Sequence, residues 1–89
     1  MRFPPGRVVA TPAALELLER YGKTPSEYLN RHLAGDWGDV DAHDHRENGR
    51  ALKTGERLFS AYGVSPLNTL WIISEADRSS TCLLLPSDY

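Results

Sequence analysis

At Gly55 the sequence changes from helix signals to strand signals. Before it, apolar residues recur at helical spacing, and each run starts at a capping residue and stops near a glycine or threonine. After it, residues 57–62, 69–75 and 81–85 are rich in β-branched, aromatic and aliphatic side chains. Turn residues at 63–68 and 77–80 separate these runs. Three adjacent strands with short links predict an antiparallel meander at the C-terminal end.

Three helices are expected ahead of this meander, after a short strand at residues 7–10. The predicted helices run from Thr11-Pro12 to Gly22, from Thr24-Pro25 to Gly35, and from Asp39 or Asp41 to Thr54. Each threonine can act as an N-cap with proline in the first helical position, and Glu27 completes a capping box with Thr24. The third helix is polar and should lie mostly exposed. The expected fold is α+β, a two-layer sandwich of helices on one face of a sheet.

Length and charge limit the classes of function. The 89 residues suffice for one hydrophobic core, so we expect a single domain over 1–89, with residues 1–6 flexible. The formal net charge of −2, mixed along the chain, does not indicate binding to duplex nucleic acid. Cys82 is the one cysteine, so no internal disulfide can form, and we expect it to be buried. No signal peptide or apolar run of membrane-spanning length is present, which predicts a cytoplasmic protein.

Several segments resemble a family of short bacterial proteins encoded on plasmids and integrative elements, some of them labelled "type I restriction endonuclease subunit M". The matching segments are Val8–Pro12, Arg31-His32, Gly35–Asp39, Asp44 with Asn48, Gly55 with Arg57, Ser60 with Tyr62, Trp71–Ile73, Glu75–Ser79, Leu84–Pro86 and Tyr89. The chain departs from this pattern at Ala13, Ser74 and Cys82. The resemblance implies a mobile-element context, and nothing in the sequence supports a methyltransferase.

Histidine and arginine supply the candidates for catalysis. His32 could form a base–orienter pair with Asp36, or could be a helix-end histidine that bonds the following turn and packs on Trp37. Arg78 could clamp a phosphate or pair locally with Asp77. If the protein is a ribonuclease, the catalytic set would be His32, Arg57, Glu75, Arg78 and Thr81, with Arg78 stabilising phosphate charge and His32 or Glu75 as acid or base.

The acidic stretch around His43 and His45 has the composition of a metal site without its spacing. Residues two apart on a helix point in different directions, and His43 with Glu47 offers only two ligands. A solvated helix start explains the acidic residues. We therefore expect neither a metal site nor a cofactor.

The candidate binding residues lie on the turn at residues 35–39, on the third helix and on the turn before the last strand. They are Asp36, Trp37, Asp44, Asn48, Asp77 and Arg78. Trp37 could be an exposed interface anchor or could fill the core beneath its turn, and Trp71 is expected in the core. Asp44 and Asn48 could bind a backbone group of the turn or of a strand, or could form a recognition surface.

Three hypotheses follow for function. The leading one is a non-enzymatic binding protein of a mobile element, with a protein partner from the host or the element, acting to inhibit a host defence system. The alternative is a small metal-independent ribonuclease, because the layout resembles that of barnase-like and RelE-like toxins. The third is a DNA-binding accessory protein that uses the first two helices, with Arg31 and His32 as the basic residues of the second.

Overall fold

The computed structural model describes all 89 residues and has the expected α+β architecture. Its elements in chain order are β1 (Arg7–Ala10), α1 (Pro12–Arg20), α2 (Pro25–Leu33), α3 (Ala42–Thr54), β2 (Leu58–Ser65), β3 (Asn68–Ser74), β4 (Ser80–Leu84) and the short 3₁₀ helix η1 (Pro86–Asp88). The four strands form one mixed sheet in the order β1-β4-β3-β2. No helix is both long and apolar enough to cross a membrane.

The helices begin and end where their capping residues predict. The Thr11 hydroxyl accepts a hydrogen bond from the Ala14 amide, and the Asp41 carboxylate accepts one from the Asp44 amide. The Thr24 hydroxyl likewise accepts from the Glu27 amide, but the reciprocal bond, from the Thr24 amide to the Glu27 carboxylate, does not form. Local side-chain chemistry therefore sets the helix boundaries.

The antiparallel part of the sheet is the predicted meander, with one shorter turn. β2 continues to Ser65, which pairs with Asn68, so only Pro66 and Leu67 form the tip of the hairpin. The sequence suggested a turn over residues 63–68, because Gly63 and Ser65-Pro66 favour turns. A change of register between Gly63 and Ser65 absorbs those residues within the strand. The N-terminal strand β1 pairs parallel with β4, with Val8 opposite Thr81.

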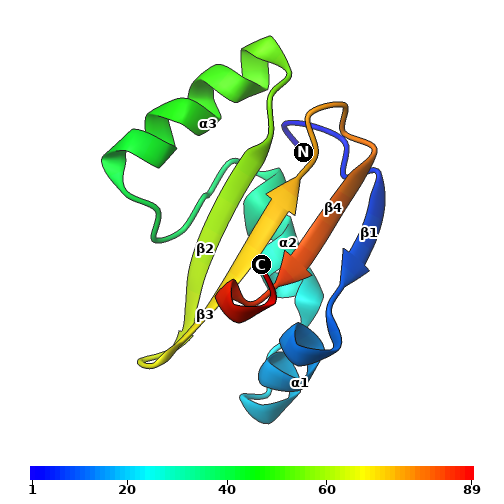
Figure 1. Ribbon diagram of the computed structural model, residues 1–89, viewed down its shortest axis with the longest axis vertical. Coiled ribbons are helices and arrows are strands. Elements are labelled where there is room, and N and C mark those ends of the chain that lie inside the picture. The colour runs from blue at the N-terminus through cyan, green and yellow to red at the C-terminus, as the bar shows by residue number, and fades with distance from the viewer.

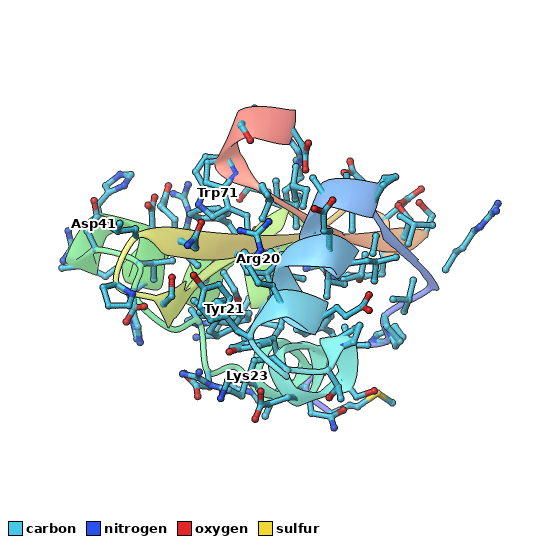
Figure 2. All side chains as sticks on the ribbon, turned by 90° about the horizontal axis from the view of Figure 1, so that it is seen from below. Arg20, Tyr21, Lys23, Asp41 and Trp71 are labelled. Atoms are coloured by element: carbon cyan, nitrogen blue, oxygen red, sulfur yellow. The ribbon has the colours of Figure 1, made fainter.

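Helices α1 and α2 cover one face of the sheet, and α3 lies along the outer edge of β2 (Figures 1 and 2). The buried side chains under the helices form two groups. One comprises Ala14, Leu18, Tyr28, Tyr62, Leu70, Ile72 and Leu83. The other comprises Phe3, Leu33, Trp37, Ala51 and Leu58. The opposite face, which we term the open face, carries only η1 and the chain end above it (Figure 2).

The N-terminal residues are packed against the domain, whereas the sequence suggested that residues 1–6 are flexible. Phe3 is buried and stacks on Trp37, with the two ring centroids 6.2 Å apart. The Arg2 amide donates to the Leu33 carbonyl at 2.7 Å, and the Pro5 carbonyl accepts from the Thr81 hydroxyl at 2.8 Å. The two prolines keep this segment extended, and it lies along the domain instead of leaving it.

Candidate binding face of the sheet

The open face carries a cluster of half-buried aromatic side chains. Strand alternation places Phe59 of β2 and Trp71 and Ile73 of β3 on this face. The Trp71 ring meets Phe59 edge-on at 5.1 Å and Tyr89 at 5.9 Å between centroids. Figure 2 shows Trp71 on the side of the sheet away from α1 and α2. The expectation that Trp71 lies in the core is wrong, because the residue occupies the face that no α-helix covers.

These side chains line a shallow hollow of about 230 Å³, which we term the aromatic hollow. Its lining residues are Arg57, Leu58, Phe59, Trp71, Ile73 and Tyr89. A second hollow of about 410 Å³ adjoins it across Arg57, between α3 and the β3–β4 turn, and is lined by Glu47, Ala51, Glu56, Arg57 and Ala76. Arg57 therefore separates an apolar hollow from a more polar one.

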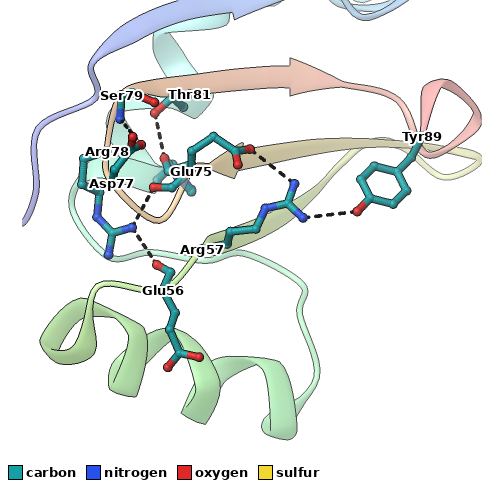
Figure 3. A network of polar contacts seen from close by, with 10 residues as sticks. Glu56, Arg57, Glu75, Asp77, Arg78, Ser79, Thr81 and Tyr89 are labelled. Carbon is teal, nitrogen blue, oxygen red and sulfur yellow. Dashed lines mark hydrogen bonds and ion pairs between the residues drawn. The ribbon is translucent and has the colours of Figure 1, made fainter.

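Arg57 and Glu75 form the charged part of the open face. Arg57 donates to the Glu75 carboxylate and to the Tyr89 hydroxyl, each at 3.4 Å (Figure 3). The hydrogen bond to Tyr89, assisted by the nearby charge of Glu75, raises the pKa of Arg57 above its usual value. The guanidinium and the carboxylate both remain about half exposed and compensate each other's charge. This pair consequently adds no net positive charge to the open face.

His32, by contrast, lies fully buried on the opposite side of the sheet. Its Nδ1 is 2.5 Å from the Ser60 hydroxyl and its Nε2 is 2.9 Å from the Ser74 hydroxyl. Burial, with a smaller effect from the charge of Arg78, lowers the pKa of His32 to about 4. A neutral imidazole that satisfies both nitrogens inside the core is structural. The base–orienter pair with Asp36 does not form.

The hydroxyl chain continues from Ser74 to Thr81 at 2.7 Å. Thr81 is buried and donates to the Pro5 carbonyl. The chain therefore links β2, β3, β4, α2 and the N-terminal segment through the core. Thr81 is part of this buried chain and is not exposed on the open face.

Arg78 is held by backbone carbonyls and has no contact with a carboxylate. Its Nη1 donates to the carbonyls of Glu56 at 2.6 Å and Glu75 at 3.0 Å (Figure 3). Nη1 also donates to the Ala76 carbonyl at 3.3 Å, and Nη2 donates to the Ala51 carbonyl at 3.0 Å. Its φ of 61° lies in the left-handed region, which is uncommon for a residue other than glycine. The side chain joins the end of α3 to the β3–β4 turn, and both of its terminal nitrogens already donate to carbonyl oxygens.

Asp77 and Asp36 have local roles in their turns. The Asp77 carboxylate accepts from the Ser79 amide at 2.9 Å, a bond typical of aspartate in a turn. The Asp36 carboxylate accepts from Arg31 at 2.7 Å, which lowers the pKa of Asp36. Both aspartates remain exposed, so these bonds leave them accessible to a partner.

The sequence left open whether Trp37 and Asn48 are surface contacts or structural residues. In the structure both are buried. Trp37 is only 4% exposed and packs edge-on against His32, so its ring fills the core beneath its turn. Asn48 is buried, donates to the Phe59 carbonyl at 2.6 Å and accepts from the Phe59 amide at 3.0 Å. Neither side chain is available as a surface contact, which corrects their assignment as binding residues.

At the acidic start of α3, Asp41 and His43 are exposed and Asp44 is half-buried. One ligand-type atom from each of Asp41, His43 and Asp44 lies within 4.8 Å of the others. Asp41 is engaged as the helix N-cap, and His43 Nδ1 lies 3.6 Å from the Asp44 carboxylate. Capping and helix-dipole compensation account for these acidic residues.

The sequence did not single out Phe59, Ile73 or Tyr89. The signal was present in the strand alternation, since Phe59 and Trp71 fall on the face opposite Ser60 and Ile72. This alternation did not show which face the helices cover, because both faces of these strands are largely apolar. Cys82, expected in the core, is half-buried on the same open face.

Comparison of the chain with protein-family models, with curated proteins and with solved structures finds no match.

Proposed function

We propose that this is a non-enzymatic binding protein that holds an apolar side chain of a partner protein in the aromatic hollow. The observation that carries the proposal is the group of three half-buried or exposed aromatic rings on the sheet face that no α-helix covers. Aromatic residues in pockets are enriched among the residues that dominate protein–protein binding energy. The adjoining hollow beside Glu47 and Glu56 offers a polar rim.

Charge favours a protein partner over a nucleic acid. Arg57, the one charged side chain that lines the aromatic hollow, is compensated by Glu75, so the rings lack a row of cations that could track a phosphate backbone. The surface of α2 does not provide them either, because Arg31 is paired with Asp36 and His32 is buried. The DNA-binding hypothesis therefore lacks the basic surface that it requires.

The geometry separates the residues that a ribonuclease would use together. His32 and Thr81 lie in the core, and the donors of Arg78 point to carbonyl groups. Only Arg57 and Glu75 are neighbours on an exposed face. An acid–base pair near a phosphate-stabilising group does not assemble from these five residues.

The resemblance to proteins of plasmids and integrative elements directs the search for the partner. A host or element protein is the expected partner, and inhibition of a host defence system is the expected role. A small binding protein that covers a functional surface needs no chemistry of its own for that role.

Partner capture from a natural host, with matched variants, tests the proposal. The wild type and the control Leu15→Ala, which alters a side chain that is 46% exposed on α1, should recover the same protein in a stoichiometric amount. Trp71→Ala and Tyr89→Ala should reduce its recovery at least about tenfold, because each removes a wall of the hollow. Tyr89 is 74% exposed, so its truncation separates loss of binding from loss of folding.

Two results would overturn this function. The first is equal recovery of every captured protein by the wild type and both hollow variants, or no stoichiometric partner at all. The second is cleavage of labelled RNA that persists in chelator and disappears in Glu75→Gln, which would establish the ribonuclease hypothesis instead.

A further inference from the structure

The two edge strands of the sheet, β2 and β1, differ in whether their outward backbone groups are hydrogen-bonded. At the β2 edge, the Asn48 side chain hydrogen-bonds both the amide and the carbonyl of Phe59. The Ala61 amide donates to the Trp37 carbonyl, and the Ala61 carbonyl accepts from Asp39. The Gly63 amide donates to the Asp39 carboxylate at 2.9 Å. Every outward-facing residue from 59 to 63 thus has a partner, which closes this edge to further strands.

The β1 edge has no such cover. The amides of Arg7 and Thr11 donate to the carbonyls of Ser79 and Leu83, which shows that the odd-numbered residues face β4. Alternation turns the amide and carbonyl of Val8 and Ala10 outward, where neither group has a hydrogen-bond partner in the protein. Val8 and Val9 are 44% and 38% exposed. Figure 1 shows β1 as the outermost strand, with no element on its outer side.

We infer that a second copy of this chain pairs with β1 through its own β1, antiparallel about a twofold axis at Val9. In that register Val8 of one copy faces Ala10 of the other, and the two equivalent pairs exchange four backbone hydrogen bonds. Val9 faces Val9 across the axis, and each Arg7 faces a Thr11, so no like charges oppose each other. The outward groups are spaced symmetrically about Val9, which makes this edge complementary to itself.

The seam is short, so the association is weak. β1 has 4 residues and is bounded by Pro5 before Gly6 and by Pro12 after Thr11, which prevents the ladder from lengthening. Four hydrogen bonds and a valine pair, set against the entropy lost on association, give a dissociation constant on the order of 1 mM. The open face stays uncovered in the dimer, so two aromatic hollows would lie on one continuous sheet. Self-association does not depend on the proposed function.

Sedimentation of the wild type between about 10 µM and 1 mM tests the inference. The average mass should rise from one chain towards two. Val8→Pro removes only an outward amide and leaves the β4-facing amides intact, so it should remain a single chain throughout. Val9→Lys, which sets like charges against each other at the axis, should weaken association at least about tenfold. Leu67→Ser, at the 94% exposed hairpin tip, is the control and should behave as the wild type does.

A single-chain mass for the wild type at 1 mM would overturn the inference. Association of Val8→Pro and Val9→Lys as strong as that of the wild type would also overturn it, since the contact would then lie elsewhere. Both variants keep their core residues unchanged. Thermal unfolding of each variant shows whether its weaker association comes from loss of the β1–β1 contact or from loss of the fold.

Discussion

The interpretation of His32 changes from catalytic to structural once its neighbours in space are known. In the sequence it stands beside a turn with an aspartate and a tryptophan, an arrangement compatible with catalysis. In the structure the aspartate pairs with Arg31, and the imidazole bonds two serines of the sheet. Because these serines are 28 and 42 residues away in the chain, no local pattern could have identified them.

The buried imidazole makes stability depend on pH. The pKa of His32 is about 4 in the folded protein and about 6.5 in the unfolded chain, so the unfolded chain binds the proton first as pH falls. The free energy of unfolding should be constant above about pH 7 and fall by about 2 kcal/mol by pH 5. Denaturant titrations at both pH values measure this difference. His32→Gln should lose most of the dependence, and an equally steep fall in that variant would refute the assignment.

At the scale of elements, the helices were predictable and the faces of the sheet were not. Thr11, Thr24 and Asp41 cap their own helices, so the information is local. The meander followed from short links between strands. The side that the helices cover was not predictable, because Trp71-Ile72-Ile73 offers apolar groups to both faces. The aromatic hollow depends on that choice of side, and for that reason the sequence did not identify it.

Asn48 illustrates how an element with few apolar contacts can still be fixed in place. The helix α3 buries only Asn48 and Ala51, yet Asn48 bonds both backbone groups of Phe59 on the edge strand. An asparagine inside a helix is unfavourable for the helix alone, so its value lies in this contact. It also blocks the β2 edge and positions Phe59, whose ring forms part of the aromatic hollow.

Asn48→Ala should therefore lower the free energy of unfolding by about 2–3 kcal/mol, because it leaves a donor and an acceptor of Phe59 without partners. Hydrogen exchange should become faster at the Phe59 amide and stay unchanged at amides between β3 and β4. Arg46→Ala, at an exposed position on the same helix, is the matched control and should change stability by less than about 0.5 kcal/mol. Equal effects from the two substitutions would mean that the contact does not hold α3.

At the scale of the whole molecule, the N-terminal segment connects parts that are distant in sequence. Phe3 packs with Trp37 and Leu33 in the core, and its ring also lies 5.3 Å from that of His32. The Arg78 guanidinium lies 5.6 Å from the centre of the same ring. The segment thus touches α2, the following turn and the β3–β4 turn, and Pro5 ends the buried hydroxyl chain.

Truncation of Phe3 should consequently destabilise the entire domain and not merely release a chain end. Phe3→Ala removes a buried ring that contacts Trp37 and His32, so the free energy of unfolding should fall by about 3 kcal/mol. Leu67→Ala provides the control, because the hairpin tip is exposed and should change stability by less than about 0.5 kcal/mol. Guanidinium unfolding followed by far-ultraviolet circular dichroism measures both. A variant at position 3 as stable as the wild type would show that the segment is an appendage, and that Trp37 and His32 are held by the sheet and α2 alone.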